Sequence, residues 1–185
     1  MQTPMQIQET FRTFRTFIAI DLTAEIKEKI GKIQKELPSD GIRLVDPEII
    51  HLTLKFLGDI NEEKIRQIKE VLSDIQFENF KAECKGVGVF PNEKYIKVIW
   101  AGIEKGSSEL KTIANKIEED LSQLGFSKDR FSPHLTIARV RKEIKIDNFL
   151  KKYKNESFGI FTVSSRDIKL KKSTLTPKGP IYEDL

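Results

Sequence analysis

The sequence predicts an α+β fold of two similar lobes, with antiparallel sheets and helices, related by a pseudo-two-fold axis around a central cleft. Two observations predict it. The chain has only two histidines, and each begins a similar four-residue motif, called a histidine word below. His51 begins His-Leu-Thr-Leu and His134 begins His-Leu-Thr-Ile. The order strand, helix, histidine strand also occurs twice along the chain. Chance repetition of Leu-Thr after both histidines has odds on the order of one in tens of thousands, so the sequence indicates a duplicated unit.

Apolar residues at alternating or helical spacing place the elements of the first half. Thr23 can cap a helix that ends at Pro38 to Gly41, and Asp59 with Glu62 resembles the capping box of a second helix. The expected elements are a strand at Arg15 to Leu22, a helix carrying Ile26, Ile30, Ile33 and Leu37, the first histidine strand at Ile50 to Leu57, and a helix carrying Ile65, Ile68, Val71, Leu72 and Ile75.

The second half follows the same rules. A hairpin is expected at Pro91-Asn92, because these residues favour turns. Gly125 suits a helix end, and Pro133 suits the start of a strand. The expected elements are strands at Phe80 to Phe90 and Tyr95 to Ile103, a helix at Ser107 to Leu124, the second histidine strand from His134, a short helix at Asp147 to Tyr153, and strands at Ser157 to Val163 and Arg166 to Lys172 that complete this half.

Length and composition indicate one globular unit. We expect residues 1–14 to be an N-terminal extension and residues 15–185 to form a single bilobal, monomeric domain, for which 38% hydrophobic residues supply a core. A lone cysteine, Cys84, excludes an intramolecular disulfide, and no signal segment or long apolar run is present, so we expect a cytoplasmic protein without a membrane role. The net charge of +4 suits a polyanionic ligand.

The two histidine words predict a polar site between the lobes. In a strand, His51 and Thr53 share one face while Leu52 and Leu54 share the other, and His134 and Thr136 do likewise. Related lobes would bring the two imidazoles to opposite sides of one cleft. Imidazole titrates near neutral pH, so one histidine can donate a proton while the other accepts one, as in-line displacement at phosphorus requires.

Simpler interpretations compete with this one. The histidines could be satisfied structural residues, and the threonines could simply be strand formers. A histidine pair could also bind a metal, but no cysteine or carboxylate stands at ligand spacing, so we expect no metal and no cofactor.

Three nearby residues leave alternatives open. Strict alternation places Arg139 on the opposite face from His134, so Arg139 reaches a phosphate only if the strand bends, bulges or ends. Lys55 shares the face of His51, but its counterpart in the second word is Ala138, so we expect a solvated lysine. Phe90, beside the turn, is either a core residue or a surface for nucleobase stacking.

The segments around both motifs resemble the 2H phosphoesterase superfamily, and within it the RNA 2′,3′-cyclic phosphodiesterase branch, formerly called 2′-5′ RNA ligases. The resemblance runs from Arg15 to the C-terminus. It is carried by Arg15 to Leu22, His51 to Gly58, Gly86 to Pro91, Pro133 to Arg139, and by Ser173, Pro177, Gly179-Pro180 and Tyr182.

The resemblance implies metal-independent opening of an RNA-terminal 2′,3′-cyclic phosphate to a 2′-phosphate. It implies that His51 is the proton donor to the leaving O3′, that His134 is the base toward water, and that Thr53, Thr136 and Arg139 bind the substrate. The expected partners are RNA 3′ ends with a cyclic phosphate, with tRNA fragments as one candidate. The alternatives are 2′-5′ joining of RNA ends, and a nucleotide-binding or RNA-binding module without turnover.

Overall fold

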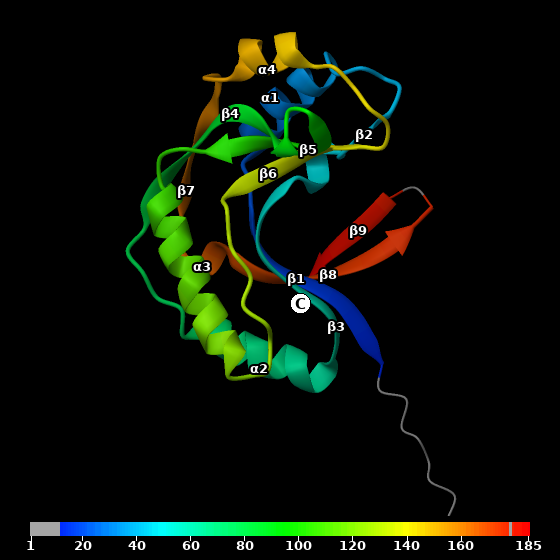
Figure 1. Ribbon diagram of the computed structural model, residues 1–185. Helices are drawn as coiled ribbons and strands as arrows, with labels where there is room; N and C mark the ends of the chain where they lie inside the picture. The colour runs from blue at the N-terminus through cyan, green and yellow to red at the C-terminus, as the bar shows by residue number, and fades with distance from the viewer. Residues whose placement is uncertain (1–11, 178) are drawn as a thin grey trace, which may run out of the picture.

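The computed structural model describes residues 12–177 and 179–185 and contains two antiparallel sheets with helices packed around them (Figure 1). This confirms the predicted α+β class. The strands are β1 (Thr13–Asp21), β2 (Ile42–Leu44), β3 (His51–Asn61), β4 (Phe80–Asn92), β5 (Tyr95–Ile103), β6 (His134–Val140), β7 (Ser157–Val163), β8 (Ile168–Thr176) and β9 (Gly179–Asp184). The helices are α1 (Ala24–Gln34), α2 (Glu62–Ser73), α3 (Ser107–Ser122) and α4 (Asp147–Tyr153), with 3₁₀ turns η1 (Pro47–Ile49) and η2 (Ser165–Asp167).

The two histidine words belong to two different sheets. The first sheet has the order β3-β1-β8-β9 and contains His51, whereas the second has the order β2-β6-β5-β4-β7 and contains His134. The two halves of the chain exchange strands. β8 and β9, from the end of the chain, pair beside β1, and β2 from the first half pairs with β6.

The strand predicted at Arg166 to Lys172 is present as β8, which begins at Ile168. It pairs with β1 of the first half, from Thr16 to Ile20. Strand pairing is set by contacts distant in sequence, which local periodicity does not report.

The element boundaries differ from the predictions mainly at their ends. β3 continues through Asp59, which pairs with Arg15 on β1, so the cap of α2 is Asn61 rather than Asp59. The Asn61 side chain accepts a hydrogen bond from the Lys64 backbone N–H at 2.9 Å. The short strands β2 and β9 were not predicted. Of the expected N-terminal extension, residues 1–11 lie outside the described residues, and β1 begins at Thr13.

One continuous core joins the two sheets. Leu52 and Leu54 of the first word and Leu135 and Ile137 of the second all belong to it, and each is at most 3% exposed. Burial of the apolar face of each word fixes which face carries the histidine. Within residues 12–177 and 179–185, no helix is long and apolar enough to cross a membrane.

Candidate active site

The two histidine words occupy equivalent positions in their sheets. Each histidine opens its strand, and the first seven residues of β3 and β6 share one sequence of burial: half-buried, buried, half-buried, buried, buried, exposed, buried. The alternation predicted for the first four residues of each word is therefore confirmed. His51 and Thr53 face away from the core on one sheet, and His134 and Thr136 do so on the other.

A β-bulge brings Arg139 to the face of His134. On β5, Ile99 lies opposite Ala138 while the next residue, Trp100, lies opposite Thr136, so β6 has one additional residue at this point. The additional residue reverses the alternation that follows. Arg139 therefore shares a face with His134 and Thr136, whereas strict alternation had placed it on the opposite face.

The same bulge occurs in β3. Ile18 of β1 lies opposite Lys55 while Ala19 lies opposite Thr53. Phe56 consequently joins the face of His51 and is 65% exposed, whereas Lys55 turns into the core. The expectation of a solvated Lys55 that shares the face of His51 was wrong, because the bulge reverses the side on which this residue lies.

Lys55 forms a buried ion pair that links the two words. It is 4% exposed, and its Nζ lies 2.7 and 2.8 Å from the carboxylate oxygens of Glu118 on α3. It also donates to the Ser127 carbonyl oxygen at 2.8 Å. Glu118 accepts from the Asp129 backbone N–H at 3.3 Å. The residue after the first motif thus anchors the loop that leads to His134.

Both imidazoles are oriented by a backbone carbonyl. Nδ1 of His51 lies 2.8 Å from the Ile49 carbonyl oxygen, and Nδ1 of His134 lies 2.7 Å from the Ser132 carbonyl oxygen. A carbonyl only accepts, so Nδ1 carries a hydrogen in both rings. Nε2 is then the ring nitrogen left to accept a proton in the neutral ring or to donate one in the charged ring.

Aromatic side chains surround His51. Its ring stacks on Phe17 at a centroid distance of 4.7 Å and meets the edge of Tyr182 at 5.2 Å. Phe17 and Tyr182 also contact each other edge to face at 4.9 Å. Burial lowers the pKa of His51 below its usual 6.5, and the positive charges of Lys171 and Lys27 act in the same direction, although the Ile49 carbonyl and Asp21 oppose them.

Two aromatic side chains, Phe90 and Trp100, pack beside His134, and the absence of a side chain at Gly88 makes room for them. Phe90 lies 5.0 Å from the His134 ring, edge to face, and 5.2 Å from Trp100. Trp100 lies against Gly88, where a Cβ would stand 2.3 Å from the indole. Phe90 is half-buried and contacts a motif histidine, so it is not a fully buried core residue.

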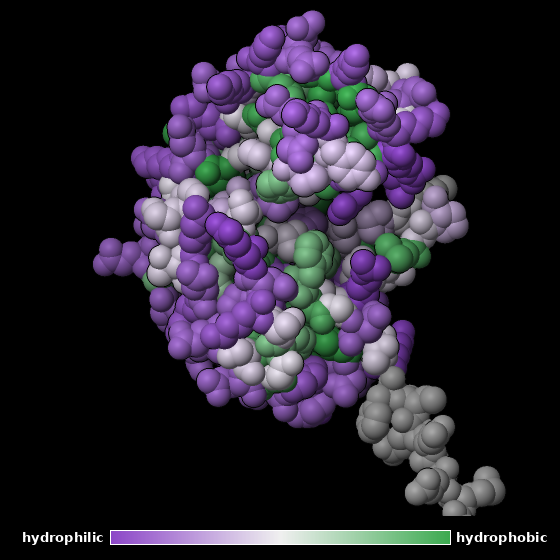
Figure 2. Space-filling model, in the orientation of Figure 1, coloured by the Kyte–Doolittle hydropathy of each residue, from purple (hydrophilic) through white to green (hydrophobic). Residues whose placement is uncertain are grey.

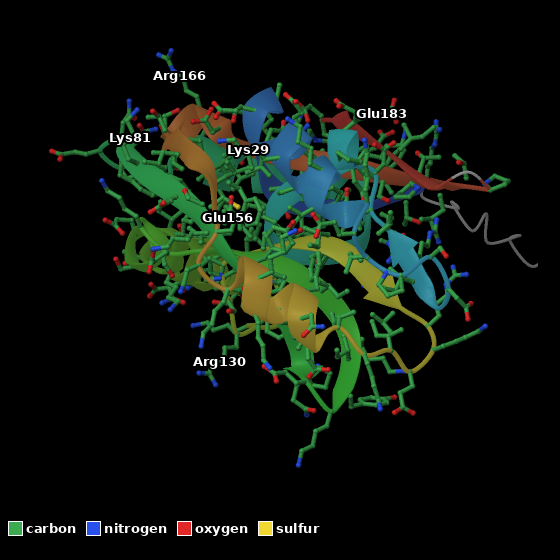
Figure 3. The ribbon with its side chains drawn as sticks, turned by 90° about the horizontal axis from the view of Figure 1, so that it is seen from above. Lys29, Lys81, Arg130, Glu156, Arg166 and Glu183 are labelled. Carbon is green, nitrogen blue, oxygen red and sulfur yellow. The ribbon has the colours of Figure 1, made fainter. Side chains whose placement is uncertain are left out.

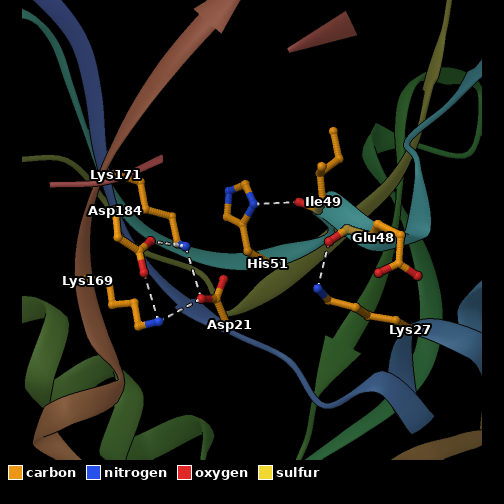
Figure 4. A network of polar contacts seen from close by, with 8 residues as sticks. All are labelled: Asp21, Lys27, Glu48, Ile49, His51, Lys169, Lys171 and Asp184. Atoms are coloured by element: carbon orange, nitrogen blue, oxygen red, sulfur yellow. Dashed lines mark hydrogen bonds and ion pairs between the residues drawn. The ribbon is translucent and has the colours of Figure 1, made fainter. Parts of the chain in front are cut away.

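A charged cluster stands next to His51 (Figure 4). Lys171 Nζ lies 3.0 Å from Asp21 and 2.5 Å from Asp184, and Lys169 contacts the same two carboxylates at 3.3 and 2.9 Å. Asp21 is the direct partner of His51 across β1 and β3. Burial opposes ionisation of Asp21, but its bonds to Lys171 and Lys169 outweigh this, and its pKa is lowered.

The two histidine strands lie close together, although they belong to different sheets. β3 and β6 contact each other directly. Tyr182, which contacts His51 on the first sheet, is close enough to Arg139 on the second to feel its charge: burial raises the pKa of Tyr182, while Arg139 and Arg15 act to lower it. Figure 2 shows the surface hollowed between the upper and lower groups of side chains on this side of the molecule.

A family model described as LigT like Phosphoesterase matches the chain twice, over residues 20–100 and 102–182. The chain belongs to the LigT-like phosphoesterase family. Each match contains one histidine word, at His51 and His134. The two matches confirm the predicted internal repeat and the resemblance from which the family was expected.

Relatives of this family cover nearly all of the chain. An RNA 2′,3′-cyclic phosphodiesterase of Archaeoglobus fulgidus is 47% identical over 174 residues, which are 92% of this chain and 97% of the relative. One of Methanocaldococcus jannaschii is 45% identical over 173 residues, 91% of this chain and 96% of the relative. The structure of Escherichia coli LigT complexed with 3′-AMP superposes with a TM-score of 0.76 at 26% identity and covers 94% of this chain and 95% of that one.

Sequence reasoning missed several side chains that this LigT-like site contains. Phe17, Asp21 and Tyr182 had been noted only as parts of segments that resemble the family. Alternation along the first strand could have shown that Phe17 and Asp21 share a face, but not that this face lies beside His51. In the part of the chain that the structure describes, no three His, Cys, Asp or Glu residues form a metal-binding group.

Proposed function

We propose that this protein hydrolyses the 2′,3′-cyclic phosphate at RNA ends to a 2′-phosphate, with His51 and His134 dividing the proton transfers. The observation that carries the proposal is the pair of histidines, each with Nδ1 on a backbone carbonyl and Nε2 available, on two strands that contact each other. The relatives from Archaeoglobus fulgidus and Methanocaldococcus jannaschii are RNA 2′,3′-cyclic phosphodiesterases. The family is a phosphoesterase family.

The reaction needs one base and one acid on opposite sides of phosphorus. Nε2 of His134 takes a proton from water as the water oxygen bonds to phosphorus. The bond from phosphorus to O3′ breaks, and Nε2 of His51 gives its proton to O3′. The products are a free 3′-hydroxyl and a 2′-phosphate. After turnover, His134 holds the proton taken from water and His51 is neutral, and exchange with solvent restores both rings.

Negative charge on the non-bridging oxygens needs hydrogen-bond donors. The hydroxyls of Thr53 and Thr136 lie two residues after each histidine on the same face, and within the described residues neither makes a side-chain hydrogen bond. Both are therefore free to donate to the phosphate. Arg139 adds a positive charge on this face, which neutral threonines do not supply.

The acid role of His51 depends on the substrate. Burial lowers the pKa of His51, which favours the neutral ring in the free protein. A cyclic phosphate carries a negative charge, and an opposite charge within a few ångströms favours the protonated ring. We propose that His51 gains its proton as the substrate binds, so that the acid forms only where it is needed.

The remaining expectations belong to the same proposal. One chain supplies both histidine words, so a monomer is sufficient for activity. Cys84 is buried, and burial with the charge of Glu83 raises its pKa to about 12, which makes it an inert thiol and suits a reducing cytoplasm. RNA ends from tRNA cleavage are one source of the cyclic phosphate. Proton transfer by two histidines requires no metal.

A direct assay tests the function. A short RNA ending in a 2′,3′-cyclic phosphate is incubated with the protein, and phosphorus NMR assigns the product. We expect a 2′-phosphomonoester. A 3′-phosphate would contradict the assigned leaving group, and tight binding without turnover would favour a binding module. Addition of an RNA with a 5′-hydroxyl tests the reverse reaction, because the same acid and base serve 2′-5′ joining.

A further inference from the structure

Two arginines outside the proposed catalytic set share the histidine faces of the sheets. Arg43 on β2 lies directly opposite Arg139 on β6, so both belong to the face of His134. On the other sheet, Arg15 of β1 lies on the face of Phe17 and Asp21, which is also the face of His51. Cations therefore extend the site beyond the histidines on both sheets.

The pairing of Arg43 with Arg139 is electrostatically unfavourable without an anion. Like charges directly opposite on neighbouring strands repel, since their Cβ atoms stand about 4.5–5.5 Å apart. Among the residues that the structure describes, neither arginine forms an ion pair, and both are exposed. The carboxylate of Asp40, which lies shortly before Arg43 in the sequence, pairs with Lys142 instead, at 3.0 Å.

Arg43 lies at the edge of the site, where the two sheets approach each other. Its guanidinium stands 3.8 Å from the position that a Cβ on Gly179 would occupy, at the start of β9 in the other sheet. Arg139 is five positions beyond His134 on β6. Given the rise per residue of a strand, Arg139 and its partner Arg43 lie on the order of 13–16 Å from that histidine along the strand. Arg139 is close enough to Tyr182 for its charge to act on the pKa of that residue. Arg43 is one strand further out and is suited to the next anionic group along a ligand.

We propose that Arg43, assisted by Arg15, binds the phosphodiester immediately upstream of the cyclic phosphate, so that this site selects RNA chains over mononucleotides. The inference rests on the proposed function. Guanidinium binds phosphate through two parallel N–H donors, and a groove lined with cations follows the backbone of single-stranded RNA. The anion would also relieve the repulsion between Arg43 and Arg139.

Three substrates test the proposal. The first is a nucleoside 2′,3′-cyclic phosphate, the second is a short RNA with the same cyclic end, and the third is that RNA with a neutral methylphosphonate at its last internucleotide linkage. The readout is the ratio of kcat/KM on the RNA to kcat/KM on the mononucleotide. Arg166→Gln is the matched control, because Arg166 is an arginine of η2 that extends away from the body of the protein (Figure 3).

We expect Arg43→Gln to lower this ratio by about 10-fold to 100-fold, the range for losing a hydrogen bond to a charged group. Arg15→Gln should lower it less, and Arg166→Gln should leave it unchanged. On the methylphosphonate RNA, wild type should lose most of its advantage and Arg43→Gln should have little further effect. The slope of log(kcat/KM) against log salt should fall by about 0.7 in Arg43→Gln with the unmodified RNA.

Failure of this inference differs from failure of the function. If Arg43→Gln leaves the ratio unchanged, or reduces it equally on the methylphosphonate RNA, Arg43 does not bind the upstream phosphodiester and the inference is overturned while hydrolysis stands. If wild type hydrolyses none of the three substrates, the proposed function itself is wrong.

Discussion

His51 and His134 are oriented by the same contact, from Nδ1 to the backbone carbonyl oxygen two residues earlier, at 2.8 and 2.7 Å. Duplication has preserved the local geometry, but the surroundings differ. His51 is enclosed by Phe17 and Tyr182 and lies beside a charged cluster, whereas His134 contacts Phe90. Two identical groups in different environments can take different roles in one reaction.

Replacing either histidine should remove most of the activity. His51→Ala lacks the proposed acid and His134→Ala the proposed base, and each step of the displacement needs both. The double variant should be scarcely slower than the single ones, because groups that act as a unit are not additive. Single-turnover rates on an RNA with a cyclic end measure this. Substantial turnover by either single variant would refute the division of roles.

The threonine hydroxyls should contribute less than the histidines. Thr53→Ala and Thr136→Ala should each lower kcat by about 10-fold to 1,000-fold, comparable to loss of one oxyanion donor. Thr53→Ser and Thr136→Ser keep the hydroxyl and should retain most of the rate. Equal losses in the alanine and serine variants would mean that the methyl group matters, and that the threonines act as strand formers rather than donors.

The ion pair of Lys55 and Glu118 should matter for stability. Lys55→Met leaves the buried Glu118 carboxylate without its partner and should lower the free energy of unfolding by about 3–5 kcal/mol. Lys55→Met with Glu118→Leu should recover much of that loss. Lys116→Met, which breaks the exposed pair with Asp120 on the same helix, is the control and should cost less than about 1 kcal/mol. Urea titrations give the three values, and simple additivity of the two buried changes would contradict the pairing.

The sequence predicted the site better than its surroundings, because the histidine words are local patterns and strand pairing is not. Alternation correctly placed His51 with Thr53 and His134 with Thr136. It failed from Lys55 and Ala138 onward, since a bulge is recognised only when the partner strand is known. One additional residue in each strand decides whether the next side chain is in the core or in the site.

The exchange of strands between the two halves of the chain could not be predicted from the sequence either. Periodicity predicted a strand near β8, but whether it pairs with β7 or β1 depends on packing across the whole chain. The position of Tyr182 follows from that pairing, because β9 adds beside β8 and brings this residue to His51. The charged cluster of Asp21, Lys171 and Asp184 depends on the same arrangement.

Chelation should leave the reaction unaffected. The proposed proton transfers use only imidazoles, and the charge on phosphate is met by hydroxyl and guanidinium groups. Activity is measured before and after dialysis against EDTA, and again after adding Mg²⁺, Mn²⁺ or Zn²⁺. A loss in EDTA that one of these ions restores would indicate a metal-assisted mechanism and would overturn the assignment of both histidine roles.

The pH dependence should separate the acid from the base. Burial lowers the pKa of His51 below 6.5, so in the free protein its acid form disappears as the pH rises through that lowered value, and kcat/KM should fall there. In the complex the phosphate charge raises the pKa of His51, so kcat should persist to higher pH than kcat/KM. The base must be neutral to accept a proton, so both profiles should also fall on the acid side.

Removing the charge of Lys171 tests directly whether His51 is the acid. This charge helps to lower the pKa of His51, so Lys171→Met should raise this pKa and shift the alkaline side of kcat/KM to higher pH. Lys169→Met is the control, because Lys169 contacts the same two carboxylates and should shift the profile less. With only two histidines in the chain, NMR titration of their ring protons follows each pKa directly. A rate that climbs steadily with hydroxide, or an alkaline side that moves to lower pH in Lys171→Met, would rule out His51 as the acid.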